Sequence, residues 1–144
     1  MKAALIALVF VGVLAVGLPT VRAIRYIAYK DQVNFFTAWQ QCLLYGGKLA
    51  SIETADQNAL VLEAIKRSRG TGGWWISGTD IGLEGSWIWL SKNIPVGSNN
   101  GYVNFAMGEP TNSGTGENCL AIEQSPLWND LPCEKLINYV CEYN

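Results

Sequence analysis

The sequence predicts a single α+β domain, and three observations lead to this fold class. Between residues 24 and 70, apolar residues recur at helical spacing. After Gly70, the chain instead contains short aromatic and β-branched runs separated by turn residues. The 144 residues are 49% hydrophobic and 15% charged, which indicates one packed core rather than a disordered chain. Four cysteines in so small a chain indicate two disulfides. We therefore expect two helices, small antiparallel sheets and long loops.

The first residues have the pattern of a secretory signal peptide. Lys2 precedes an apolar run from Ala3 to Leu18, and the small-residue pattern Val21-Arg22-Ala23 follows it. A membrane anchor is the alternative, but the run is shorter than the ~20 apolar residues that a membrane span needs. We expect a signal peptide over residues 1–23, a domain over residues 24–144, secretion to the extracellular space and no membrane span in the mature chain.

Two helices are expected next, each with its own N-cap. Asn34 offers the N-cap of the first helix, whose apolar spacing ends before Gly46. Thr54 and Gln57 form a capping-box pattern for the second helix, which is expected to extend to Gly70.

The expected strands are short runs of aromatic and β-branched residues. They span Arg25 to Lys30, Lys48 to Ile52, Trp74 to Ser77, Trp87 to Leu90, Cys119 to Glu123 and Asn138 to Tyr143. Residues 94–101 and 108–116 are expected to be loops. The six tryptophans could form a platform that stacks on sugars, but their spacing on the predicted elements favours packing in the core.

Composition excludes several classes of function. The chain contains no histidine, which removes Ser-His-Asp catalysis, Cys-His catalysis and His-ligated zinc. Its formal charge of −2 argues against a partner whose many phosphates must be neutralised, so no nucleic-acid partner is expected. The cysteines contain no Cys-x-x-Cys pair, and their spacing alone does not choose among the possible disulfide pairings.

Oxygen-bearing side chains gather in three segments, Glu109-Pro110-Thr111-Asn112, Gly116-Glu117-Asn118 and Trp128-Asn129-Asp130. Calcium takes about six to eight oxygen ligands from carboxylates, amides and backbone carbonyls, whereas zinc prefers Cys or His. Loops rich in Asn, Gly and acidic residues also occur on ordinary protein surfaces. Composition alone therefore leaves both a calcium site and a plain surface loop open.

Between about Tyr26 and the last residue, the chain contains an ordered set of motifs: Cys42, Trp75-Ile76-Ser77-Gly78-Thr79-Asp80, Glu109-Pro110, Glu117-Asn118-Cys119, Trp128-Asn129-Asp130, Cys133 and Tyr139-Val140-Cys141-Glu142. This set resembles the C-type lectin-like domain family. The Ser-Gly-Thr-Asp motif, in a small chain that is expected to be secreted, makes the sequence similar to insect C-type lectins. The resemblance implies the C-type lectin-like fold, a cis peptide bond at Glu109-Pro110 and two nested disulfides, Cys42–Cys141 and Cys119–Cys133.

The resemblance also implies Ca²⁺ as the cofactor of a site that binds sugar. Its metal ligands and sugar contacts would be Glu109, Glu117, Asn129 and Asp130. Position 111 departs from the sugar-binding pattern, because Thr111 replaces an Asn and a hydroxyl cannot offer a carbonyl and an amide donor together. Asn112 is a candidate substitute for the missing amide.

A second metal site would map, by the same resemblance, to Asp80, Glu84, Asn112, Glu117 and Asn118. Two positions that are often acidic in that site are Asn here, which disfavours a second ion.

The function that the resemblance implies is calcium-dependent carbohydrate binding of the mannose type, in innate immune recognition of glycans on microbial or host surfaces. Weak single-site affinity would favour non-covalent self-association. The alternative is a C-type lectin-like scaffold that binds a protein or lipid surface without sugar or calcium, which Thr111 keeps open. A glycosidase with Glu109 and Glu117 as its carboxylate pair is disfavoured because these groups serve better as metal ligands, so no enzyme activity is expected.

Overall fold

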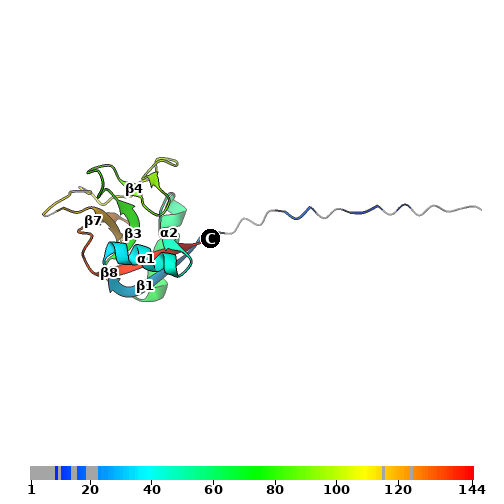
Figure 1. The fold of residues 1–144 in the computed structure, drawn as a ribbon, viewed down its shortest axis with the longest axis horizontal. Helices are drawn as coiled ribbons and strands as arrows, with labels where there is room; N and C mark the ends of the chain where they lie inside the picture. The colour runs from blue at the N-terminus through cyan, green and yellow to red at the C-terminus, as the bar shows by residue number, and fades with distance from the viewer. Residues whose placement is uncertain (1–8, 10, 14–15, 19–22, 115, 124) are drawn as a thin grey trace, which may run out of the picture.

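The computed structural model describes residues 9, 11–13, 16–18, 23–114, 116–123 and 125–144. Most of the expected signal peptide, including Val21 and Arg22 at its cleavage pattern, lies outside these residues, so the leader stays a prediction. Its described valines, such as Val13 and Val16, are highly exposed. The described part of this N-terminal segment extends away from the folded domain (Figure 1). Within the described residues, no helix has the length and apolar character needed to cross a membrane.

The described residues form two helices and eight strands, which confirms the α+β class. In chain order the elements are β1 (Arg25–Val33), α1 (Phe35–Leu44), β2 (Lys48–Leu49), α2 (Ala55–Ser68), β3 (Trp74–Thr79), β4 (Ile88–Trp89), β5 (Ile94–Pro95), β6 (Cys119–Ile122), β7 (Trp128–Leu131) and β8 (Ile137–Tyr143).

Both helices begin at the predicted N-caps. Asn34 Oδ1 accepts the Thr37 N–H at 2.8 Å, and Thr54 Oγ1 accepts the Gln57 N–H at 3.1 Å. Each bond satisfies a backbone donor that the first helical turn leaves without a partner. Helix α2 ends earlier than predicted, because Arg69 already adopts the left-handed conformation with φ 57°.

The strands form one mixed sheet rather than the small antiparallel sheets that the sequence predicted. Its order is β1-β8-β3-β4-β5, with β2 also paired to β8 and β6 paired to β3 and β7. Strands β3 and β8 run parallel, whereas the other strand pairs are antiparallel. A parallel pair needs a long crossover, and the chain from β4 to β7 provides it.

Four strand predictions need correction. The strand predicted from Lys48 to Ile52 contains only the two residues of β2. The strand predicted from Trp87 to Leu90 contains only the residues of β4, and β5 lies inside the predicted loop 94–101. Strand β7 was not predicted as a strand, because its Asn-Asp pair is typical of loops. It forms because it pairs residue by residue with β6, from Cys119↔Leu131 to Ile122↔Trp128.

The two helices cover opposite faces of the sheet (Figure 1). Trp74 and Ile76 of β3 pack in one core cluster with Val61 and Ile65 of α2, whereas Trp75 packs in the other with side chains of α1. Successive residues of a strand point to opposite faces, so the central strands are buried on both sides.

The tryptophans confirm the prediction of core packing. Trp74, Trp75, Trp89 and Trp128 are fully buried, and Trp39 and Trp87 are partly buried. The Trp128 ring meets the rings of Trp89 at 5.3 Å, Phe105 at 5.6 Å and Tyr102 at 5.7 Å. These edge-on contacts attach the long loops to the core beneath them.

The disulfides are Cys42–Cys141 and Cys119–Cys133, which is the pairing that the resemblance implied. The first joins α1 to β8, and the second joins β6 to the segment that precedes β8. The first disulfide therefore joins two elements of the body of the domain, and the second ties the base of the β6–β7 hairpin to the segment that leads into β8.

Candidate functional site

The candidate site lies where the long β5–β6 connection meets the β6–β7 hairpin. The Trp128 N–H donates to the Asn104 carbonyl at 2.9 Å, and the Ala106 N–H donates to the Trp128 carbonyl at 2.9 Å. This short bridge aligns the connection with β7, so that Glu109 lies beside Asp130. The Glu109-Pro110 bond is cis, as the resemblance implied.

Asp130 is the most rigidly held carboxylate of the site, because it is buried and lies on a paired strand. It is only 1% exposed, and its position on β7 is held by pairing with Leu120 on β6. Its carboxylate accepts the N–H of Thr111 at 3.2 Å and the N–H of Asn112 at 2.8 Å. The buried carboxylate thus holds the chain directly after the cis bond. Asn129, the residue before Asp130, is half-buried.

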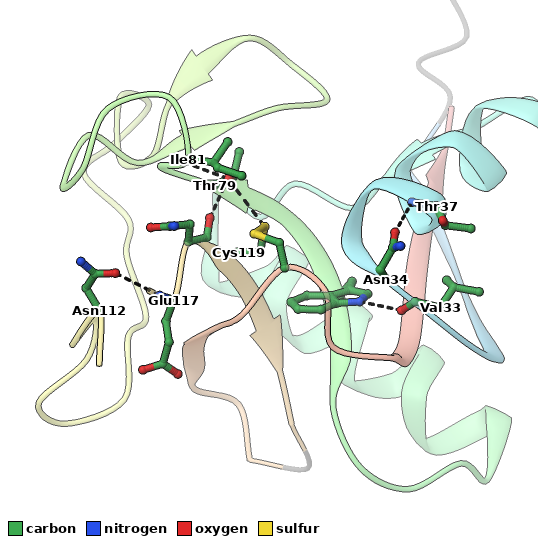
Figure 2. The surroundings of a disulfide bond; sticks show 11 residues. Val33, Asn34, Thr37, Thr79, Ile81, Asn112, Glu117 and Cys119 are labelled. Carbon is green, nitrogen blue, oxygen red and sulfur yellow. Dashed lines mark hydrogen bonds between the residues drawn. A yellow bond between two sulfur atoms is a disulfide. The ribbon is translucent and has the colours of Figure 1, made fainter. Parts of the chain in front are cut away.

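Glu117 closes the loop from the other side. Its carboxylate accepts the Thr111 hydroxyl at 3.2 Å, the Ser113 N–H at 3.0 Å and the Ser113 hydroxyl. The Glu117 N–H donates in turn to Asn112 Oδ1 at 2.9 Å, a contact drawn in Figure 2. The four residues therefore form a turn that is satisfied by its own hydrogen bonds.

Ser113 was missed by the sequence reasoning, although it donates twice to Glu117. It lies between Asn112, which adopts a positive φ of 51°, and Gly114 with φ 65°. The only indication in the sequence is the Asn-Ser-Gly run, which is typical of a turn with left-handed residues. Thr111 and Asn112 are exposed, and in this structure both are bound to the predicted carboxylate ligands rather than directed away from them.

The crowding of carboxylates shifts their proton affinities in opposite directions. The hydrogen bond with Asp130, burial and the charges of Asp130 and Glu117 raise the pKa of Glu109 to about 7. Burial alone would raise the pKa of Asp130, but hydrogen bonds from Glu109 and from the N–H groups of Asn112 and Thr111 outweigh it and lower that pKa. Among the described side chains, no Lys or Arg forms an ion pair with these acids.

The donor chemistry of this group fits a hard cation. Carboxylates of Glu109, Glu117 and Asp130 with the amide of Asn129 are the oxygen donors that Ca²⁺ takes. However, no three acidic or cysteine side chains of the described residues are gathered closely enough to hold a metal ion by themselves. A calcium ion here would therefore need amide or backbone oxygens as well, and Glu117 would have to exchange its contacts with Ser113 for the ion.

The residues of the expected second site lie together but are arranged differently. Asp80 is 3% exposed and accepts the Gly85 N–H at 2.8 Å. With its amide nitrogen facing the acids, Asn118 donates to Asp80 at 3.0 Å and to Glu84 at 3.1 Å. Burial and the nearby Asp80 raise the pKa of Glu84. The Asn118 amide thus acts between the two carboxylates as a donor rather than as a metal ligand.

The backbone of this second group is fixed by β3. The Thr79 hydroxyl donates to the Asn118 carbonyl at 2.6 Å, and it accepts the Ile81 N–H at 3.2 Å (Figure 2). The same hydroxyl lies 3.7 Å from Cys119 Sγ. Asn112, the remaining residue expected in the second site, contacts Glu117 and Asp130.

Comparisons with known proteins agree with this fold and with the motif order. The family model described as Lectin C-type domain matches residues 31–143. Perlucin of Haliotis laevigata is 28% identical over 112 residues, which cover 76% of this chain and 69% of that protein. The low affinity immunoglobulin epsilon Fc receptor of Mus musculus is 33% identical over 118 residues, which cover 81% of this chain but only 33% of the receptor.

A solved structure extends the comparison to three dimensions. The cow C-type carbohydrate-recognition domain of CD23, determined in the presence of a GlcNAc2Man3 oligosaccharide, superposes with a TM-score of 0.73 at 30% identity. The match covers 85% of this chain and 89% of that domain. The predicted similarity to insect lectins is not tested by these relatives.

Proposed function

Because the chain belongs to the C-type lectin domain family, we propose that it is a calcium-dependent carbohydrate-binding protein. The observation that carries the proposal is the group of Glu109, Glu117 and Asp130 beside Asn129, in which no described cation balances the acids. C-type lectin domains typically bind calcium, and the family consists generally of binding proteins rather than enzymes. We accordingly propose binding without cleavage of any bond.

Each residue has a separate role in the proposed site. Calcium, when bound, supplies direct coordination of two neighbouring sugar hydroxyls. Glu109 and Glu117 accept hydrogen bonds from those hydroxyls, and the Asn129 amide donates one. Asp130 holds the N–H groups of Thr111 and Asn112, which fixes the loop after the cis bond. Glu109 before the proline supports a preference for mannose over galactose.

We propose one calcium ion rather than two. The Asn118 amide donates to both Asp80 and Glu84, so a hydrogen-bond donor already lies between these carboxylates. A cation there would have to displace it. The pair is therefore proposed to stabilise the loop without metal.

The proposed setting follows from the predicted leader and from the weak affinity of a single sugar site. We propose that the protein is secreted after removal of residues 1–23 and binds glycans on microbial or host surfaces in innate immunity. Non-covalent self-association would raise the avidity for clustered glycans.

A second candidate function has a specific observation in its favour. The carboxylates of Glu117 and Asp130 are already bound by the N–H groups and hydroxyls of residues 111–113. A loop that is satisfied without an ion suits a scaffold that binds a protein or lipid surface without sugar or calcium.

A glycan array with and without chelator tests these proposals together. Retention on mannose-rich glycans that chelator abolishes, with no sugar released, is the expected result. Chelator-insensitive binding to a protein or lipid surface would favour the second function, and released sugar would indicate a glycosidase. Glu134→Gln is a suitable control for Asp130→Asn, because it removes one exposed acid outside the site.

A further inference from the structure

A pocket near the C-terminal end of β8 gathers positive side chains from three separate elements. It has a volume of about 370 Å³. Its lining includes Arg25 of β1, Lys48 of β2 and Lys92 from the turn after β4, with Glu142 and Tyr143 of β8. Figure 1 shows this end of β8 on the side of the domain away from β7. The pocket is therefore distinct from the Asp130 site.

Two of the three cations have no acidic partner among the described side chains. Lys92 Nζ lies 2.6 Å from Glu53 and 3.7 Å from Glu142, so its charge is already balanced. Arg25 and Lys48 form no such ion pair with the described acids. Two cations without ion-pair partners beside a cavity raise the local concentration of anions.

The pocket also orients the arginine. The Arg25 guanidinium lies 5.8 Å from the centroid of the Tyr143 ring, a distance at which a cation is attracted to an aromatic face. The Tyr143 hydroxyl shares a hydrogen bond of 2.7 Å with the Tyr29 hydroxyl, which fixes the ring. The Tyr143 ring thus orients the guanidinium of Arg25 beside the pocket, although the residue is exposed.

The one acidic side chain of the lining does not cancel this charge. Glu142 is only 4% exposed, and its Oε1 accepts the Ser51 N–H at 3.3 Å. Its other oxygen faces Lys92. The carboxylate is therefore engaged by the Ser51 N–H and the half-buried Lys92, with a lesser attraction from Lys48, whereas Arg25 and Lys48 are exposed.

We propose that this pocket binds the sulfate ester or carboxylate of an acidic saccharide without calcium. A guanidinium makes paired hydrogen bonds to such oxyanions, and a lysine adds a point charge. The volume is in the range of small-ligand sites. The saccharide as carrier rests on the ligand class of the family, whereas the oxyanion rests on the pocket. The acidic loops around Asp130 would repel the same group.

The test uses the whole protein in the presence of a chelator, so that the calcium site does not contribute. Sodium sulfate, a sulfated disaccharide and its unsulfated counterpart are titrated separately, with calorimetry and with NMR shifts of the backbone amides. We expect the sulfated disaccharide to bind more tightly than sulfate, the unsulfated one not to bind, and shifts at Gly47, Lys48 and Tyr143.

Two double variants of equal charge separate a site from general attraction. Arg25→Gln with Lys48→Gln is expected to weaken binding about tenfold or more, because charge-assisted contacts are lost. Lys66→Gln with Lys135→Gln removes two exposed cations outside the pocket and should leave the affinity within about twofold. Melting curves verify that both fold.

Several results would overturn the proposal. These are equal weakening in both double variants, shifts centred elsewhere, no binding of the sulfated disaccharide by the wild type, or equal affinity for free sulfate and the disaccharide. The calcium-dependent mannose assay is unaffected by any of them.

Discussion

The helix-covered sheet and the Asp130 loop are held in place by different interactions. In the sheet, side chains such as Trp75 and Tyr139 are fully buried between elements that are far apart in the chain. In the loop, residues 111–113 are exposed and are held by hydrogen bonds to Asp130 and Glu117. The stability of the sheet thus depends on buried area, whereas the loop depends on the charge of two carboxylates.

This difference indicates how each part should respond to change. Removing buried volume should destabilise the whole domain whether or not calcium is present. Adding a cation or changing one loop side chain should instead alter binding while leaving the sheet intact.

The largest effect is expected in the sheet, from Trp75→Ala. Trp75 is fully buried, meets Phe35 edge-on at 5.7 Å and donates its indole N–H to the Val33 carbonyl at 2.9 Å. Denaturant unfolding should show a loss of about 3–5 kcal/mol, since a large buried aromatic leaves a cavity. The control Leu136→Ala, at a side chain that is 61% exposed, should stay within about 0.5 kcal/mol. Similar losses for both variants would contradict the role of burial.

The next effect belongs to the loop and requires calcium. An ion that binds only the folded loop stabilises the domain by about 2.7 kcal/mol at a free concentration of 100 Kd. The melting temperature should therefore rise across millimolar calcium in the wild type and not in Asp130→Ala. Glu134→Gln should retain the wild-type shift. A wild-type melting curve that calcium leaves unchanged would favour the scaffold without metal.

The same difference explains which parts of the fold could be predicted from the sequence. The N-caps Asn34 and Thr54 were predicted correctly because a cap depends on residues within the same turn. Strand β7 was not, because its Trp-Asn-Asp sequence has little strand preference and its pairing comes from β6. The parallel alignment of β3 with β8 was also missed, since it depends on a crossover between distant segments.

In the site, residue types could be predicted but their mutual contacts could not. The carboxylates and the cis bond at Glu109-Pro110 followed from the motif resemblance. The donor role of Ser113 depends on left-handed conformations at its neighbours, and the orientation of the Asn118 amide depends on two acids from another loop. Neither is specified by spacing along the chain.

A smaller effect is expected in the pH dependence of the unfolding free energy, through Glu142, a buried acid of the sheet. Burial raises the pKa of Glu142, although Lys92 and the Ser51 N–H oppose the shift. Because the folded pKa exceeds the unfolded one, this carboxyl stabilises the fold fully below the unfolded value of 4.5, and that contribution is lost as the pH rises through the folded pKa.

Glu142→Gln tests this sign, because an amide can still accept the Ser51 N–H but does not titrate. The unfolding free energy of the wild type minus that of the variant should decrease between about pH 4 and pH 7. Denaturant unfolding at several pH values measures it. A difference that increases over this interval would show that the attraction of Lys92 outweighs burial.

The smallest effect concerns Thr111, whose hydroxyl donates to Glu117 at 3.2 Å and whose N–H donates to Asp130 at 3.2 Å. An asparagine keeps the N–H contact and adds a carbonyl for the ion and an amide donor for the sugar. One regained hydrogen bond of about 0.5–1.5 kcal/mol should make Thr111→Asn bind mannose about two- to tenfold more tightly than the wild type.

Thr111→Val is the matched control, because it removes only the hydroxyl and should bring no gain. Calcium is titrated first, then mannose and galactose, into each form. An added donor beside an intact set of carboxylates should strengthen the mannose-type contact and leave the preference for mannose over galactose unchanged. If the asparagine variant binds neither sugar more tightly, or comes to prefer galactose, position 111 therefore does not have the role inferred for it.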